Sequence, residues 1–191
     1  MSGPMQHNRK GVFENAEIRN QLVKPYLSEL GVDPMGQRPL PDRKNLLPFP
    51  NLATKVEMVM KFNGYKDGPW FYKGAKLCLM WTLWHEAFPN AKWIIVRRTD
   101  EGIINSCMKT GFMRAYQDAA GWQTWIDEHK VCFAEMKAAG LQMAEVWPSK
   151  FVAGDFGEVQ RVVIRFLRLR WRDTKVREFI EPAYWSTQHG K

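Results

Sequence analysis

The feature that most constrains the fold is a short apolar run, Trp93-Ile94-Ile95-Val96, placed between two helical segments. Such a run of β-branched and aromatic residues is long enough for an inner strand of a parallel sheet. The apolar segment 77–88 before it and the segment 100–109 after it both read as helices. Strands that alternate with helices are typical of βαβ units. The sequence therefore predicts an α/β fold with a parallel sheet.

The remaining elements follow from the same periodicity. Strands are expected at 70–72, where the apolar aromatic run indicates a buried strand, and at 144–147. Further helices are expected over 14–30, 52–62, 122–139 and 157–167. Pro25 is expected to kink or end the first of them.

One long segment should be irregular. Residues 31–51 contain five prolines and two glycines, which disfavour both helix and strand. A loop of this length in a compact domain is either a surface connection or a lid or substrate-binding segment. The sequence leaves both alternatives open.

Length and composition indicate a single soluble domain over 1–191. The chain is 45% hydrophobic, no apolar run approaches the ~20 residues that cross a bilayer, and no secretory signal opens the sequence. The three cysteines form no zinc-binding spacing and are expected to be reduced core thiols, which predicts a cytoplasmic location. The net charge of +8 favours an anionic partner: a phosphorylated small molecule, a nucleic acid or an acidic surface.

A candidate anion site follows the strand 93–96. Arg97 and Arg98 come directly after it, and Thr99 or Asp100 is expected to cap the next helix. Ligands of parallel α/β sheets lie beyond the carboxyl ends of the strands. A guanidinium and a helix N-terminus both bind phosphate, and Ser106 could add a hydroxyl from two turns into the helix. The alternative is that both arginines are solvated or paired with carboxylates.

The segment from Arg98 to Ser106 resembles the element by which PAPS-dependent sulfotransferases bind the 3′-phosphate of 3′-phosphoadenosine 5′-phosphosulfate (PAPS). That element is a strand, an arginine and a serine eight residues later. The resemblance extends over most of the chain, in the family's order. It includes the stretches FYKGAKLCLMWTLWHEAFPNAKWIIVRR (71–98), EVWPSKFVAGDFGEVQRVVIRFLRLRW (145–171) and NRKGVFEN (8–15), the last similar to bacterial and phage-type members.

The resemblance implies a three-layer, P-loop-like sulfotransferase fold. The activity implied is sulfuryl transfer from PAPS to a hydroxyl or amine acceptor. Arg98 and Ser106, with Arg97, would hold the 3′-phosphate. Lys73, with Lys76 as the alternative, would lie near the reacting groups. No metal is implied, and no histidine or carboxylate pair has a ligand spacing.

The sequence departs from the family at the loop that binds the 5′-phosphosulfate. No G-x-x-x-x-G-K-[ST] motif occurs, and the glycine-containing stretch 64–76 has neither this spacing nor the family's. We therefore expect weak or absent catalysis by the chain alone. The family's first strand lies inside the sheet, so its absence predicts association with a second copy or with a complementing N-terminal segment.

Two other functions remain open on the sequence. One is a non-catalytic module that binds the nucleotide product, adenosine 3′,5′-bisphosphate (PAP). The other is a nucleic-acid-binding protein that uses a helical stripe of Arg161, Arg165, Arg168 and Arg172. Alternatively, these arginines form the solvated face of an amphipathic helix. Trp122 and Trp125 either line a substrate cleft or belong to the core, and His85 and His129 are expected to be structural.

Overall fold

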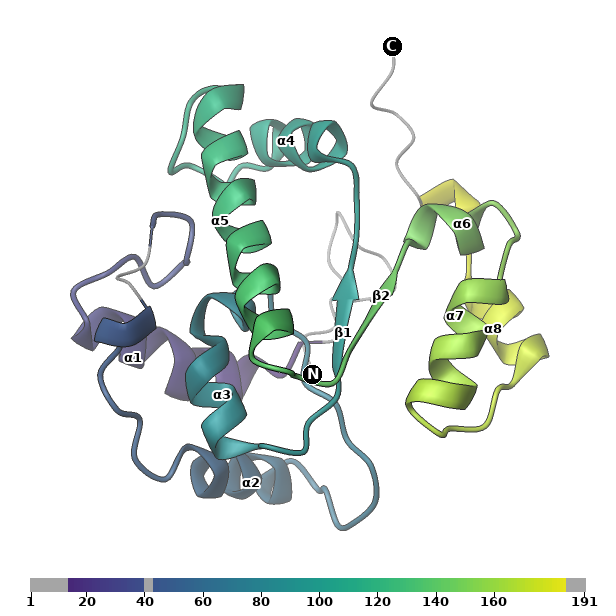
Figure 1. Ribbon diagram of the computed structural model, residues 1–191, viewed down its shortest axis with the longest axis horizontal. Helices are drawn as coiled ribbons and strands as arrows, with labels where there is room; N and C mark the ends of the chain where they lie inside the picture. Colours follow the sequence, from purple (N-terminus) through teal and green to yellow (C-terminus); the bar gives the residue numbers. More distant parts are fainter. Residues whose placement is uncertain (1–13, 40–42, 185–191) are drawn as a thin grey trace. The chain divides into compact units, whose positions relative to one another are not determined.

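A computed structural model describes residues 14–39 and 43–184 (Figure 1). Two compact units are present, one formed by Met1–Asn90 with Asp127–Glu135 and the other by Ala91–Ile126 with Met136–Lys191. Most of the 8–15 stretch that contributed to the family resemblance, and three residues of the proline-rich segment, lie outside the described residues. Within the described part of the chain, no helix is long and apolar enough to cross a membrane.

The first unit is helical. Its described elements are the π-helical turn η1 (Ile18–Val23), α1 (Lys24–Glu29), the 3₁₀ turn η2 (Arg43–Asn45), α2 (Leu52–Phe62), the 3₁₀ turn η3 (Cys78–Met80) and α3 (Trp81–Ala87). The predicted helix 14–30 is confirmed, but Pro25 does not end it. In the turn before it the Lys24 N–H bonds to the Arg19 carbonyl, five residues back, so the proline falls where the α-helical pattern is already interrupted.

The proline-rich segment has no strand or α-helix in its described residues, as predicted. Side chains of the helices hold it in place. The Tyr26 hydroxyl donates to the Leu47 carbonyl at 2.7 Å, and its ring stacks on Phe49 with centroids 4.9 Å apart. Arg43 pairs with Glu135 of helix α5 (Ala119–Ala138) at 2.6 Å. The segment is therefore fastened to the core of this unit at two separate points.

The expected strand at 70–72 is wrong. These residues have no regular structure, and Trp70 and Phe71 are 37% and 77% exposed. The aromatic side chains pack on α3 instead: Tyr72 stacks on Trp84, and Trp70 meets Phe88 edge-on. Aromatic stacking on a helix thus buries apolar surface in a run that the sequence pattern assigns to a sheet.

The second unit contains a two-stranded parallel sheet. Strand β1 (Trp93–Val96) pairs with β2 (Met143–Val146), and Val96 lies opposite Val146. The helices are α4 (Asp100–Lys109), α5 (Ala119–Ala138), α6 (Pro148–Val152), α7 (Gly157–Arg161) and α8 (Asp173–Phe179), with the π-helical turn η4 (Val162–Phe166) and the 3₁₀ turn η5 (Pro182–Tyr184). The chain is thus a mixed helix and strand protein with parallel pairing, as the α/β prediction requires.

Strand β1 is not an inner strand among the described residues. The Trp93 and Arg97 N–H groups bond to carbonyls of the β2 side at 2.8 Å, so the N–H groups of Ile94 and Val96 point away from β2. Val96 is 66% exposed and Ile94 38%, whereas Ile95 is buried. The sequence pattern did not predict an edge strand, because an apolar run has the same composition whether the strand has one neighbouring strand or two.

Candidate functional site

The turn from β1 into α4 carries the predicted anion site. Thr99 is the N-cap, and its hydroxyl accepts a hydrogen bond from the Gly102 N–H at 3.2 Å. This satisfies one of the N–H groups that the first turn of a helix leaves unpaired. Strand, arginine pair, cap and ten-residue helix follow one another as the sequence predicts.

Arg98 lies along α4. A Cβ placed on Gly102 would stand 2.9 Å from Arg98 Nε and 3.5 Å from Arg98 Cγ. Gly102 and Ser106 are four residues apart and share one helix face. The guanidinium also reaches Cys107 electrostatically: burial raises the pKa of that thiol, and the Arg98 charge opposes the rise. Arg98, Gly102 and Ser106 therefore form one line along the first two turns of α4.

Ser106 supplies a hydroxyl in this line. The residue is half-buried, and its backbone carbonyl accepts from the Thr110 hydroxyl at 2.6 Å. Its own hydroxyl makes no hydrogen bond within the described residues. A hydroxyl with both donor and acceptor capacity is therefore available two turns after Arg98.

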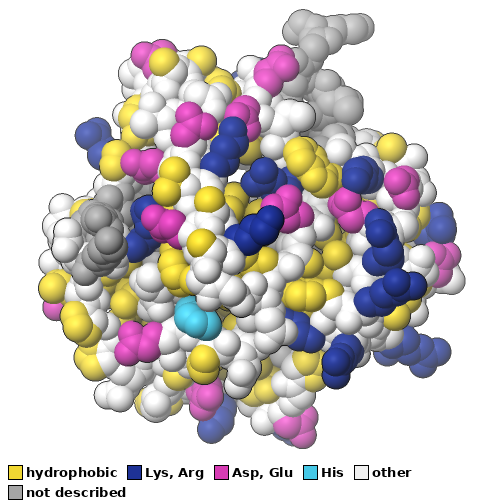
Figure 2. Space-filling model, viewed as in Figure 1, with side chains coloured by type: hydrophobic (Ala, Val, Ile, Leu, Met, Phe, Trp, Pro, Cys, Tyr) yellow, Lys and Arg dark blue, Asp and Glu magenta, His cyan; other side chains and the backbone are white. Residues whose placement is uncertain are grey.

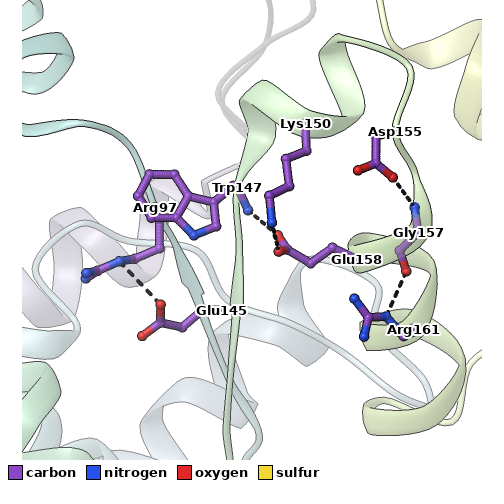
Figure 3. Close-up of polar contacts among 8 residues, drawn as sticks. All are labelled: Arg97, Glu145, Trp147, Lys150, Asp155, Gly157, Glu158 and Arg161. Carbon is purple, nitrogen blue, oxygen red and sulfur yellow. Dashed lines mark hydrogen bonds and ion pairs between the residues drawn. The ribbon is translucent and has the colours of Figure 1, made fainter.

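Arg97 contacts side chains of β2 and of the residue after it (Figure 3). Its Nε lies 3.5 Å from a carboxylate oxygen of Glu145 on β2. Its guanidinium also stands 5.9 Å from the centre of the Trp147 ring, within the range of a cation–π contact. These contacts hold Arg97 on the sheet.

Two acidic residues limit how strongly the α4 N-terminus attracts an anion. Asp100 and Glu101 lie in its first turn, where carboxylates stabilise a helix by offsetting its positive end. The Gln123 side-chain amide donates to Asp100 at 3.0 Å. Any phosphate affinity here must therefore come mainly from the arginine and the serine rather than from the helix dipole.

Lys73 and Lys76 belong to the first unit and have contrasting surroundings. Lys73 is exposed, in irregular chain after Tyr72. The Lys76 side chain packs so closely on Gly36 that a Cβ there would lie 2.9 Å from Lys76 Cγ. Burial lowers the pKa of Lys76, while the charge of Glu14 opposes the shift and those of Lys24 and Arg19 add to it. A lysine whose pKa is lowered by burial is a better base or nucleophile near neutral pH than a fully solvated lysine.

A small cavity of about 40 Å³ adjoins Lys76. Its lining includes Tyr72, the Gly74 backbone, and the Glu14–Arg19 ion pair, whose atoms are 2.9 Å apart. Burial, with a smaller contribution from the Glu14 charge, raises the pKa of the Tyr72 hydroxyl. The cavity has room for a water molecule rather than for a substrate. It brings a phenol, an amine and a carboxylate into one polar cluster, which the sequence pattern did not identify.

The other side chains singled out in the sequence are mainly structural. Trp122 is fully buried and meets the rings of Tyr116 and Trp125 edge-on, so it belongs to the core and does not line a cleft. Cys78, Cys107 and Cys132 are free and buried, as predicted. Among the described residues, no group of three or more His, Cys, Asp or Glu side chains gathers as metal ligands would.

The segment after β2 folds around one carboxylate that the sequence did not mark (Figure 3). Glu158 of α7 accepts a hydrogen bond from the Trp147 N–H at 2.7 Å. It also pairs with the Lys150 ammonium at 2.5 Å. These contacts, led by the Lys150 hydrogen bond, lower the pKa of Glu158. Glu158 thus satisfies the backbone at the end of β2 and fixes the start of α6.

No protein-family model, curated protein or solved structure matches this chain.

Proposed function

We propose that this chain is a sulfotransferase-like protein of P-loop-like fold that binds PAPS and takes part in sulfuryl transfer to a hydroxyl or amine acceptor. In that reaction the acceptor attacks sulfur, the bond between sulfur and the bridging phosphate oxygen breaks, and PAP leaves. The acceptor's proton passes to a base. The described residues contain no loop of the kind that holds the 5′-phosphosulfate, so we propose that turnover requires a further segment.

The observation that carries this proposal is the alignment of Arg98, Gly102 and Ser106. Arg98 lies against Gly102, and Ser106 presents a hydroxyl without a hydrogen-bond partner within the described residues. A guanidinium binds phosphate through two parallel hydrogen bonds, and a hydroxyl can add a third. In the proposed complex, Arg98 and Ser106 hold the 3′-phosphate and Arg97 contributes at longer range.

A lysine would assist the transfer by placing positive charge near the oxygen that leaves sulfur. Lys73 is the candidate that the resemblance favours. The residue is exposed to water. Lys76, the alternative, lies against Gly36 with a lowered pKa. A neutral amine would serve better as the base that accepts the acceptor's proton than as the cation.

The open side of β1 supports the proposed need for a completing partner. The N–H groups of Ile94 and Val96 point to this open edge and have no partner among the described residues, and their apolar side chains are exposed on one face of the sheet. A parallel strand is normally covered on both sides, and an open strand edge is a template for another strand. We propose that a second copy or a complementing strand occupies it. A single monomeric species in sedimentation velocity at micromolar concentration would exclude the second copy.

The test is calorimetric titration of adenosine 3′,5′-bisphosphate into the wild type and into Arg98→Ala. Loss of a charge-assisted contact should cost about 1.5 kcal/mol or more, a tenfold or greater weakening. Lys137→Ala is the matched control, because it removes one positive charge from an exposed residue of the same unit. Its affinity for the ligand should stay that of the wild type.

A second ligand tests which phosphate of the nucleotide Arg98 contacts. Adenosine 5′-monophosphate lacks the 3′-phosphate, so Arg98→Ala should leave its binding unchanged. A well-folded wild type that binds neither nucleotide would overturn the proposal. Binding of PAP that depends on Arg98, but without release of PAP from PAPS in the presence of hydroxyl and amine acceptors, would mark the chain alone as a nucleotide-binding module.

A further inference from the structure

Most of the chain's net charge is concentrated in one short segment of the second unit. Residues 161–177 contain seven Lys and Arg against a single Asp, a net charge of +6 out of +8 for the whole chain. Six of the seven cations are arginines, whose planar guanidinium suits phosphate better than an ammonium does. We call this set the basic segment: Arg161, Arg165, Arg168, Arg170, Arg172, Lys175 and Arg177.

All seven cations are exposed, and few are neutralised. Arg177 pairs with Asp173 at 2.7 Å, and Arg161 Nε donates to the Gly157 carbonyl at 3.2 Å. Within the described residues the side chains of the other five make no hydrogen bond or ion pair. Cations that no carboxylate of the same protein neutralises are available to an external anion.

The fold brings these cations together, but not as the predicted helical stripe. The helical turns end at Phe166, Arg168 has a left-handed backbone with φ of 59°, and the chain up to Arg172 is irregular. It then folds back, because Trp171 packs against Phe156 and Arg177 lies 4.4 Å from the centre of the same ring. In Figure 2, Lys and Arg side chains gather over the part of this unit that carries α7 and α8.

A hollow lies within the basic segment. It has a volume of about 530 Å³ and is lined by the consecutive residues Arg170 to Lys175. Its lining therefore carries three cations around Trp171, which is half-buried and fixed by a hydrogen bond from its indole N–H to Asp173 at 3.1 Å. The combination of guanidinium groups with an aromatic ring suits a nucleotide unit.

We propose that the basic segment is a binding surface for the phosphodiester backbone of a nucleic acid, with Trp171 beside the hollow that receives one nucleotide. The contact is electrostatic and independent of base sequence. A membrane surface fits less well, because α7 and α8 have only five and seven residues and present no long amphipathic face. This surface is separate from Arg98 and Ser106 and does not depend on the proposed sulfuryl transfer.

The test uses fluorescence anisotropy with labelled 20-nucleotide single-stranded DNA, single-stranded RNA and double-stranded DNA over a salt series. The variant is the triple substitution Arg165→Gln, Arg170→Gln and Arg172→Gln, which removes three exposed charges without making a cavity. The slope of log K against log salt concentration should fall by about 0.7 per lost phosphate contact on a single strand and about 0.9 on a duplex. The three probes show which nucleic acid the surface prefers.

A charge-matched control tests whether position matters. Lys61→Gln, Lys66→Gln and Lys137→Gln together produce the same net charge from exposed positions outside the basic segment, and should bind nearly as the wild type. Equal loss in both triple variants would overturn the proposal, as would no binding at 50 mM salt or binding only to vesicles of anionic lipid. Arg98→Ala should bind nucleic acid unchanged, which separates this surface from the proposed nucleotide site.

Discussion

Arg97 Nε stands 3.5 Å from the Glu145 carboxylate across the paired strands, whereas its neighbour Arg98 lies against Gly102 of α4. The two adjacent arginines therefore contact different parts of the fold. Arg97 pairs with Glu145 of β2 and packs over Trp147, and in the proposed complex Arg98 would share the 3′-phosphate with Ser106. This division makes Arg98 the residue whose loss should affect ligand binding most.

Gly102→Ala should weaken binding of adenosine 3′,5′-bisphosphate severalfold without unfolding α4. The new Cβ would lie 2.9 Å from both Arg98 Nε and the Thr99 hydroxyl, so the arginine must move from its present line. Alanine itself favours a helix more than glycine does. Calorimetric titration measures the affinity. Gly111→Ala is the control, because nothing lies within 4 Å of a Cβ at that position; equal affinities of the two variants would contradict the placement of Arg98.

Gly121→Ala should destabilise the protein. A Cβ at Gly121 would lie 2.6 Å from Cβ and Cγ of Tyr116, whose ring packs edge-on against buried Trp122. Forcing atoms into a packed core costs about 1–3 kcal/mol, which outweighs the gain of at most about 1 kcal/mol from alanine in a helix. Urea unfolding measures the difference.

A double substitution tests the cause. In Tyr116→Gly with Gly121→Ala every clashing atom of residue 116, its Cβ included, is absent, so the two costs should not add. Additive losses would show that the glycine is needed for another reason.

The sequence predicts the elements whose pattern is decided locally. Helix α2 and helix α4 have the predicted bounds, since apolar spacing defines the first and the Thr99 cap the second. Strands β1 and β2 were found for the same reason. The run at 70–72 was misassigned because its aromatic rings stack on α3, a contact that the local pattern does not contain.

The candidate sites show the same limit. Gly102 and Ser106 are four residues apart on α4, so their shared face follows from the helix period, whereas Arg98 precedes the Thr99 cap and meets Gly102 through its side chain. The burial of Lys76 depends on Gly36, forty residues earlier, which adopts a φ of 63°. The basic segment was predicted as a stripe on one helix, but the helical turns end at Phe166 and the chain beyond forms a different surface. Long-range packing decided both outcomes.

Stability should fall as the pH rises above 9. Burial raises the pKa of the Cys78 thiol to about 12 and that of Cys132 to about 11, from an ordinary value of 9.0. Below pH 9 both thiols are protonated in the folded and unfolded states, and their stabilising contribution is complete. Between pH 9 and the folded-state values only the unfolded chain loses protons, so folding is progressively disfavoured.

Urea unfolding at pH 7, 9 and 10.5 measures this effect. Cys78→Ala should lower stability at every pH because it shortens a core side chain, and its further loss between pH 9 and 10.5 should be smaller than in the wild type. The Tyr72 hydroxyl adds to the decline in both proteins. Identical declines in wild type and variant would show that Cys78 does not contribute.

Lys76→Met should stabilise the protein at pH 7, and its advantage should shrink as the pH approaches 10.5. Burial lowers the folded-state pKa of Lys76 below its ordinary value of 10.5, so at neutral pH the folded protein holds a charge that its surroundings disfavour. As the pH rises through the lowered pKa, the unfolded state binds more protons than the folded one, and the wild type recovers stability. Methionine keeps the length of the side chain against Gly36 and does not titrate.

Urea unfolding of both proteins at pH 7, 9 and 10.5 gives the stability difference, in which the contributions of the cysteines and Tyr72 cancel. Lys73→Met is the matched control, because it makes the same substitution at a residue exposed to water. Its stability difference from the wild type should not shrink as the pH rises. A stability gain in Lys76→Met that is the same at all three pH values would assign the effect to packing alone. It would show that burial does not disfavour the charge on Lys76. The proposal that Lys76 acts as a base would then have no support.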